Sequence, residues 1–282
     1  MKSAQQSALK STQKAAHEAA YVLHSWDWSE SSLIVDLFTR SQGRVVVVAK
    51  GAKRPTSQMR AVLLPFQRLV VAFGTRRDKK EAEASEVHTL RHAERAGGGP
   101  IPGGEALLSG FYLNELLMKL LAREDPHPAL FDAYAAVMPL LGGQGRAFDE
   151  AALEITLRSF ELLLLREVGL LPELSRVTAT QRPLEPAGGY RIDAERGLVE
   201  HERDGAALDG RLLVALEEAL SNAPAAQRLD AIAAAELRPV AAALKLNLRP
   251  LLQYHLGQSA LRTRTLMQDL SRLPHHSAKP AR

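Results

Sequence analysis

Basic side chains are concentrated in one stretch of the chain, between residues 40 and 80. That stretch holds eleven lysines and arginines and one acidic residue, Asp78, so its net charge is about +10. Because the whole chain of 282 residues carries only +4, the remainder sums to about −6. The basic residues are Arg40, Arg44, Lys50, Lys53, Arg54, Arg60, Arg68, Arg76, Arg77, Lys79 and Lys80. This segregation indicates a site for an anionic ligand, and several phosphate contacts together would bind a nucleic acid strand without reading its sequence.

Two loops contain the densest basic residues. The sequence Lys50-Gly51-Ala52-Lys53-Arg54-Pro55 follows a β-branched run, and its glycine and proline predict a turn where long side chains can reach a groove. Residues 76–80 form a second loop of the same kind. The alternative is that both loops only keep the protein soluble, but two clusters that flank strands of one small domain favour nucleic-acid binding. Trp26, Trp28 and Phe38 are either platforms for stacked bases or parts of the core.

No sequence motif of a catalytic site is present. The chain lacks the glycine-rich phosphate loops, the HExxH zinc motif and the GxSxG nucleophile motif. It contains no cysteine, which excludes disulfides and thiolate metal sites, and its histidines are scattered without ligand spacing. Residues 201–204 could supply a metal ligand or an acid/base group, although surface loops have the same composition. We therefore expect no catalytic residue, cofactor or metal, with a metal-dependent enzyme of nucleic-acid metabolism and an RNA-binding module as the alternatives.

The basic stretch lies in a region of strand-like periodicity. Short β-branched runs occur at residues 21–23, 33–38, 45–48 and 69–73. Glycine and proline separate these runs, and Ser41-Gln42-Gly43 predicts a hairpin between the second and the third. Four or five strands within about 70 residues predict an N-terminal OB-fold barrel over residues 21–95.

Helical periodicity replaces the strand pattern after a glycine- and proline-rich stretch at residues 96–104. We interpret this stretch as a linker, with a long loop inside one domain as the alternative. Residues 105–266 predict an all-α helical domain that contains a small irregular insertion at residues 172–210. The overall prediction is a multidomain protein of the β plus α class. Residues 1–20 predict a flexible tail and residues 267–282 a basic tail.

The helical domain contains a candidate docking surface for a protein partner. Its first helix, residues 105–123, would present an apolar groove, rimmed by Lys119 and Arg123, to an acidic and hydrophobic tail. A plain helical core is the alternative explanation of its leucines. Near the end of the domain, Pro239 predicts a helix N-terminus and Pro250 a break. The absence of an apolar leader and of a long apolar run predicts a cytoplasmic protein without a membrane span.

A series of short motifs runs through the chain in a specific order. In the first third they are Tyr21-Val22-Leu23, residues 30–34, Phe38-Thr39-Arg40, Gly43-Arg44, residues 49–55 and Leu64-Pro65-Phe66. Later they are residues 111–117, 126–131, 160–162, 166–169, 255–257 and 261–264. Taken together, the motifs resemble the RecO family of bacterial DNA repair proteins over roughly residues 20–266.

The resemblance implies an N-terminal OB barrel, a C-terminal helical domain and a role as a recombination mediator. Members of this family bind single- and double-stranded DNA and anneal complementary strands. They act with a RecR partner to let RecA replace single-strand binding protein, and their helical domain grips the acidic C-terminal tail of that protein. From this resemblance, Lys50, Lys53 and Arg54 are expected to contact DNA. It also implies a cytoplasmic protein associated with the nucleoid.

One departure from the family pattern concerns the insertion. Many members carry a small four-cysteine zinc module there, whereas the matching residues 174–184, with Val177 and Thr180, contain no cysteine. Zinc is therefore not expected.

Overall fold

The computed structural model describes residues 17–74, 87–97, 100–143, 149–202, 204–224, 227–235, 237–257 and 261–271. The chain divides into two units. The first consists of Met1–Thr39 and Val45–Gly97, and the second of Arg40–Arg44 and Gly98–Arg282. The division between Gly97 and Gly98 lies in the glycine- and proline-rich stretch that separates strand-like from helical periodicity.

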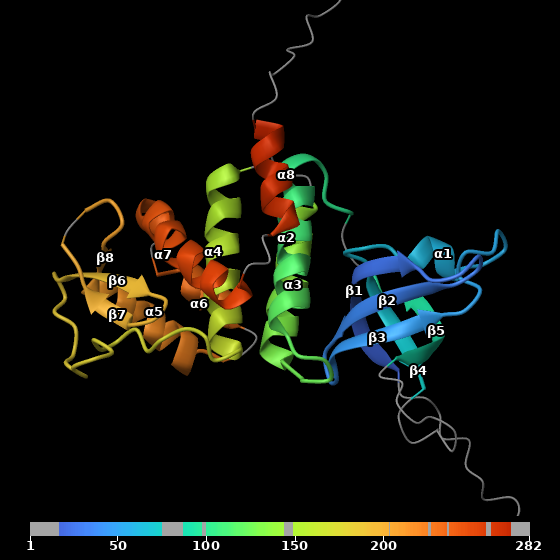
Figure 1. Ribbon diagram of the computed structural model, residues 1–282, viewed down its shortest axis with the longest axis horizontal. Coiled ribbons are helices and arrows are strands. Elements are labelled where there is room, and N and C mark those ends of the chain that lie inside the picture. Colours follow the sequence, from blue (N-terminus) through green and yellow to red (C-terminus); the bar gives the residue numbers. More distant parts are fainter. Residues whose placement is uncertain are drawn as a thin grey trace, which may run out of the picture. The chain divides into compact units, whose positions relative to one another are not determined.

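The first unit is a closed barrel (Figure 1). Its strands are β1 (Glu18–Asp27), β2 (Leu33–Thr39), β3 (Gly43–Ala49), β4 (Arg68–Phe73) and β5 (His88–Arg95). They are arranged in the order β1-β2-β3-β5-β4, and β1 closes the barrel by pairing antiparallel with both β2 and β4. A small five-stranded barrel is the architecture of the OB fold, so the fold class predicted for this part of the sequence is confirmed.

A β-bulge in β1 decides which of its side chains face the barrel core. Val22 lies in the core and pairs with Leu37, another core residue. After a register shift, His24 pairs with Asp36, which is the neighbour of Leu37 and faces the opposite side of the sheet. Paired residues face the same side, so the shift turns the following even-numbered positions of β1 outward. His24 and Trp26 therefore point away from the core that Val22 enters.

Four of the five strands correspond to the β-branched runs of the sequence, and these strand predictions are confirmed. The strand β5 and the single-turn helix α1 (Met59–Val62) carried no such signal. Only His88 and Leu90 of β5 are buried, and most of its remaining residues are polar and exposed. Such a strand has almost no hydrophobic alternation, so its pairing with β3 and β4 defines it.

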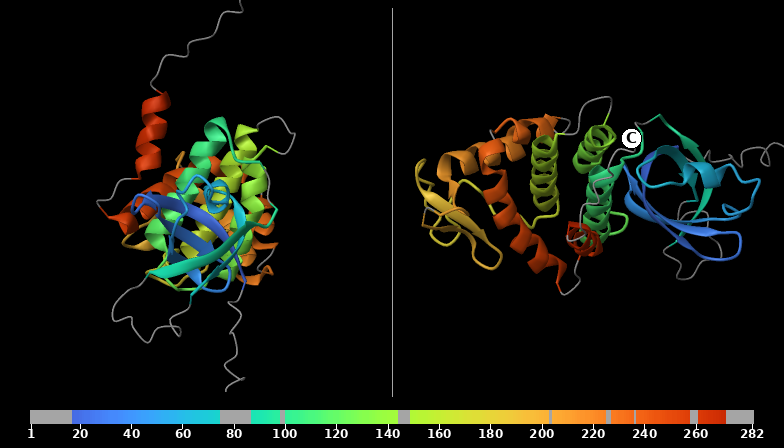
Figure 2. Two further views of the ribbon diagram at one scale, coloured as in Figure 1. Left: turned by 90° about the vertical axis from the view of Figure 1, so that its right-hand side faces the viewer. Right: turned by 90° about the horizontal axis from the view of Figure 1, so that it is seen from above.

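The second unit is mainly helical, as the sequence predicted. Its helices are α2 (Gly104–Leu120), α3 (Pro128–Leu141), α4 (Glu150–Glu167), α5 (Gly210–Asn222), α6 (Arg228–Ala233), α7 (Ala241–Leu256) and α8 (Arg262–Ser271), with a 3-10 turn, η3 (Arg238–Val240), before α7. The helix α4 lies between α3 and α7 (Figure 2). Of the described helices, none combines the length and apolar composition that a membrane span requires.

The expected helix break at Pro250 is wrong, because α7 runs through it from Ala241 to Leu256. Proline inside a helix removes one backbone hydrogen bond. Here Pro250 lies on the exposed side of α7, while Leu248, Leu251 and Leu252 are buried. Burial of this leucine face holds the helix together across the missing bond.

The insertion at residues 172–210 is more regular than its composition indicated. It contains a small sheet in which β6 (Gly189–Asp193) lies between β7 (Gly197–Glu200) and β8 (Leu208–Asp209). Asn247 of α7 anchors this sheet, because its side-chain oxygen accepts the backbone N–H of Ile192 at 2.8 Å and its amide nitrogen donates to the carbonyl of Ala206 at 2.8 Å. Such short strands depend on contacts of this kind more than on their own sequence pattern.

Candidate nucleic-acid interface

Lys53 ties together two loops of the barrel. Its backbone N–H donates to the carbonyl of Ser31 at 2.9 Å, and its ammonium group donates to the carbonyl of Ser29 at 3.1 Å. The same ammonium nitrogen lies 3.1 Å from Oδ2 of Asp27. Asp27 ends β1 and both serines lie between β1 and β2, whereas Lys53 lies in the loop after β3. The two loops are therefore held side by side, and we refer to them, residues 27–32 and 50–58, as the tied loops.

Cations around Lys53 extend into solvent. Lys50 and Arg54 lie in the loop after β3, and Arg60 follows in α1. All three are exposed, and none forms a side-chain hydrogen bond or ion pair with another described residue. Gly51 has a φ of 71°, a left-handed conformation that other residues adopt only with strain, so the turn between Lys50 and Arg54 depends on this glycine. The geometry presents positive charge that nothing described in the protein neutralises.

Trp26 directly precedes the tied loops, and Trp28 lies in one of them. Trp26 is 42% exposed and Trp28 is 64% exposed, whereas Phe38 is completely buried. Of the three aromatic candidates for base stacking, Phe38 is therefore a core residue. Asp27, which Lys53 contacts, lies between the tryptophans in sequence.

Arg40 and Arg44 belong to the second unit and are engaged there. The guanidinium of Arg40 forms a two-point ion pair with Asp132, with both nitrogen–oxygen distances at 2.9 Å. The guanidinium of Arg44 donates to the carbonyls of Met118 and Leu121. A phosphate would have to compete with these acceptors. The two arginines differ in this respect from Lys50, which is exposed and has no side-chain partner among the described residues. Their contact with DNA stays a prediction.

The remaining basic residues of the predicted site are not brought to the tied loops by any described contact. Arg68 is exposed on β4 opposite Tyr21 of β1. Burial raises the pKa of Tyr21, and the positive charge of Arg68 offsets this in part. Four more predicted residues, Arg76, Arg77, Lys79 and Lys80, lie outside the described residues, and their DNA contact stays a prediction.

Comparison with known proteins shows what the chain is related to. A family model described as "Recombination protein O N terminal" matches residues 14–91, and one described as "Recombination protein O C terminal" matches residues 103–265. The chain belongs to the RecO family. The DNA repair protein RecO of Acidovorax ebreus (strain TPSY) is 54% identical over 261 residues, which cover 92% of this chain and 98% of that protein. The DNA repair protein RecO of Paracidovorax citrulli (strain AAC00-1) is 52% identical over 260 residues, which cover 91% and 97%.

The predicted docking residues of this RecO family member lie on and just after α2. The ammonium of Lys119 is 3.6 Å from the carboxylate of Glu115. That carboxylate also accepts the backbone N–H groups of Arg262 and Thr263 at 2.9 and 3.0 Å and thereby caps the N-terminus of α8. Burial of Glu115 opposes its ionisation, but these hydrogen bonds outweigh burial, and the pKa of Glu115 is lowered. Arg123 is exposed beyond the end of α2.

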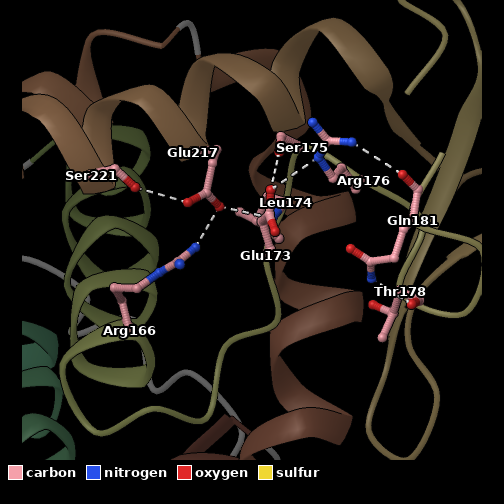
Figure 3. Close-up of polar contacts among 9 residues, drawn as sticks. All are labelled: Arg166, Glu173, Leu174, Ser175, Arg176, Thr178, Gln181, Glu217 and Ser221. Atoms are coloured by element: carbon pink, nitrogen blue, oxygen red, sulfur yellow. Dashed lines mark hydrogen bonds and ion pairs between the residues drawn. The ribbon is translucent and has the colours of Figure 1, made fainter. Parts of the chain in front are cut away.

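The residues of the insertion do not fit the four-cysteine zinc module found in many RecO family members. The start of the segment is held by the carboxylate of Glu217, which accepts the backbone N–H of Leu174 at 2.7 Å, the guanidinium of Arg166 at 2.5 Å and the hydroxyl of Ser221 at 2.8 Å (Figure 3). Throughout the described part of the chain, no cluster of three histidine, aspartate or glutamate residues could hold a metal ion.

The polar segment at residues 201–204 has a local structural explanation. The carboxylate of Asp204 accepts the backbone N–H groups of Ala206 and Ala207 at 2.8 and 3.0 Å, and its other oxygen lies 3.0 Å from Nε2 of His201. The hydrogen bond from Ala206, followed by that from His201, lowers the pKa of Asp204. A carboxyl that caps a turn in this way is occupied with backbone donors and is a poor general base.

Proposed function

We propose that this chain is a recombination mediator of DNA repair that captures single-stranded DNA on its barrel. The observation that carries the proposal is the group of exposed cations on the tied loops and the adjoining α1, Lys50, Arg54 and Arg60. Phosphates are suitable ligands for these cations, because each contact releases condensed counterions from the strand. Family membership supports DNA as the ligand, since the relatives are named DNA repair proteins.

Capture through the phosphate backbone leaves the bases available for pairing. Lysine and arginine contacts to phosphate fix the position of a strand but read no sequence. A strand that Lys50 and Arg54 hold in this way can still meet its complement, and this supports annealing of complementary strands as part of the function. Duplex DNA carries the same backbone charge and would bind through the same cations.

The mediator role requires protein partners as well as DNA. We propose that the acidic C-terminal tail of single-strand binding protein docks along α2, at Lys119 and Arg123. The support is the positive charge of Lys119 near the end of α2 and of the exposed Arg123 just after it, and an arriving tail would exchange the ion pair of Lys119 with Glu115 for one of its own. A RecR partner would act together with this protein once the tail has docked. RecA would then assemble on the exposed strand without binding this protein directly.

No bond is made or broken in this proposed mechanism. Incubation of the protein with labelled DNA and a divalent metal ion should leave the DNA intact. Metal-dependent turnover above that of a control lacking the protein would instead favour an enzyme of nucleic-acid metabolism.

The central test is a binding titration with a short labelled single strand at several salt concentrations. We expect an affinity that falls as salt rises, with a slope of about −0.7 for each phosphate contact. Competition with RNA of equal length decides between a DNA mediator and an RNA-binding module. A parallel titration with an acidic peptide that ends in an aliphatic-aromatic pair tests the docking surface. Affinity for the strand that does not change with salt would contradict the proposal.

A further inference from the structure

We propose that Trp26 and Trp28 form a stacking platform for the unpaired bases of single-stranded DNA. The platform would let the barrel distinguish a single strand from a duplex, which phosphate contacts alone do not do. This inference rests on the proposed function, because it assigns a second, base-directed set of contacts to the same surface.

Exposure separates the two tryptophans from the other aromatic residues of the barrel. Tyr21, Phe38, Phe66 and Phe73 are all at most 7% exposed and belong to the folded interior. Trp26 and Trp28 are 42% and 64% exposed, although tryptophan has the largest ring system. Large aromatic surfaces left in water are characteristic of binding sites, and a flat indole ring is a general partner for the face of any base.

The bulge in β1 is what turns Trp26 toward solvent. Without a register shift after Val22, Trp26 would share the inward face of the strand with Val22, because residues two apart alternate regularly. In the shifted register Trp26 pairs with Ile34 and points outward. The ring of His24 lies edge-on against it, with the ring centroids 4.5 Å apart and the planes inclined by 68°. Trp26 nevertheless remains 42% exposed, so part of its ring is available for stacking.

Lys53 contacts the segment that carries both rings. Lys53 contacts Asp27, the residue between the tryptophans, and the carbonyl of Ser29, the residue after Trp28. The loop that carries Lys50 and Arg54 is thereby held against the segment that carries the rings. Aromatic rings next to cations match the alternation of bases and phosphates in a single strand, and this complementarity selects single-stranded DNA over an apolar peptide. In a duplex the base faces are stacked on one another and are not available.

The intrinsic fluorescence of the protein reports directly on this platform. The chain contains only two tryptophans, and both belong to the platform. We expect a thymine oligonucleotide to quench the tryptophan emission as it binds. An abasic oligonucleotide of the same length has the same phosphates but no bases, so it should bind more weakly and leave the emission almost unchanged. Equal quenching by the two oligonucleotides, or binding without quenching, would overturn the proposal.

Substitution of Trp28 separates stacking from phosphate contact. A base stacked on the ring of Trp28 adds to the affinity for a single strand, so Trp28→Leu should weaken single-strand binding about tenfold and Trp28→Phe clearly less. Neither variant should change duplex affinity or the salt slope. Thermal unfolding checks that both variants fold, which is expected because the ring is exposed. Unaltered single-strand affinity of a folded Trp28→Leu variant would eliminate the platform.

The outcome for the cations distinguishes failure of this inference from failure of the proposed function. If removal of Lys50 and Arg54 weakens DNA binding while Trp28→Leu does not, the interface stands and stacking is wrong. If neither change has an effect, the barrel surface is not the DNA site and both proposals fail. Sedimentation of the unliganded protein adds a further arm, because association that Trp28→Leu abolishes would show that the rings contact a second copy of the chain instead of DNA.

Discussion

In the helical unit, several arginine side chains lie against carboxylates of the same unit, whereas the described Arg54 of a barrel loop is exposed. Arg158 is 2.7 Å from Glu161, and Arg228 is 2.8 Å from Glu167. On the barrel, Arg54 has no side-chain partner among the described residues.

The contrast separates charge that stabilises the fold from charge that is available to a ligand. A buried and paired charge cannot be removed without leaving its partner unsatisfied. An exposed and unpaired cation contributes little to stability and keeps its capacity to neutralise a phosphate. Substitution of a buried, paired charge in the helical unit should therefore change stability, and substitution of an exposed cation in the barrel loops should change binding.

The strongest expected effect is on the buried pair of Arg158 and Glu161. Their side chains are 8% and 1% exposed, and Arg158→Met would leave the carboxyl of Glu161 buried without its cation. We expect a loss of about 3–5 kcal/mol in the free energy of unfolding, measured by urea denaturation. The matched control is Arg182→Met, because Arg182 pairs with Glu200 at 2.5 Å but both side chains are at least 60% exposed. That change should lower the free energy of unfolding by less than about 1 kcal/mol. Equal losses for the two variants would show that burial does not decide how much an arginine–carboxylate pair contributes to stability.

A second effect concerns the insertion and its anchor Glu217. Glu217→Ala removes the acceptor for the backbone N–H of Leu174 and for the guanidinium of Arg166. Hydrogen bonds to charged groups contribute about 1.5–3 kcal/mol, so we expect a loss of about 2 kcal/mol and faster amide exchange in the insertion. Glu218→Ala is the control, because Glu218 is the exposed neighbour on the same helix. Unchanged exchange at Leu174 would show that Glu217 does not organise the segment.

In the barrel, removal of two cations should change binding without changing stability. The double substitution of Lys50 and Arg54 by alanine removes two candidate phosphate contacts, so the salt slope should become shallower by about 1.4. Affinity for all sequences should fall alike, by roughly tenfold at moderate salt. Replacement of the exposed Arg196 and Arg211 of the helical unit by alanine lowers the net charge equally and serves as the control. Equal effects of both double variants would show that DNA binding depends on the net charge of the protein and not on the position of these two cations.

The smallest expected effect is a pH dependence at Glu115. Because its pKa is lowered in the folded protein, Glu115 adds stability that is complete above the unfolded-state pKa of about 4.3. This contribution is lost as pH falls through the lower pKa of the folded protein. Glu115→Gln should therefore be less stable than the unmodified protein at neutral pH, and the difference should shrink as the solution is acidified. A difference that stays constant down to pH 3 would show that ionisation of Glu115 is irrelevant to docking of α8.

Local patterns in the sequence account for much of the fold. The β-branched runs correspond to β1, β2, β3 and β4, and the leucine periodicity corresponds to α2, α3 and α4. Asp149 at the start of α4 accepts two backbone N–H groups, as an N-cap should. Patterns of this kind depend on residues that are near neighbours in the chain, so they can be recognised in the sequence alone.

Other features of the fold could not be predicted from local sequence patterns. The strand β5 has too few apolar residues to show alternation, and Pro250 is tolerated because the leucines around it are buried. The carboxylates of Glu115 and Glu161 look like surface residues in the sequence, yet both are buried by helices that are distant in the chain.

For the candidate interface, amino-acid order alone already concentrated eleven cations in one segment and placed two tryptophans near its start. It could not show which cations remain free. Arg40 lies against Asp132, 92 residues away, while Lys53 is bound to a neighbouring loop and Lys50 and Arg54 extend into solvent. The outward direction of Trp26 likewise depends on a bulge in the pairing of β1 with β2. Pairing and exposure arise from contacts between residues far apart in the chain, and only folding brings those residues together.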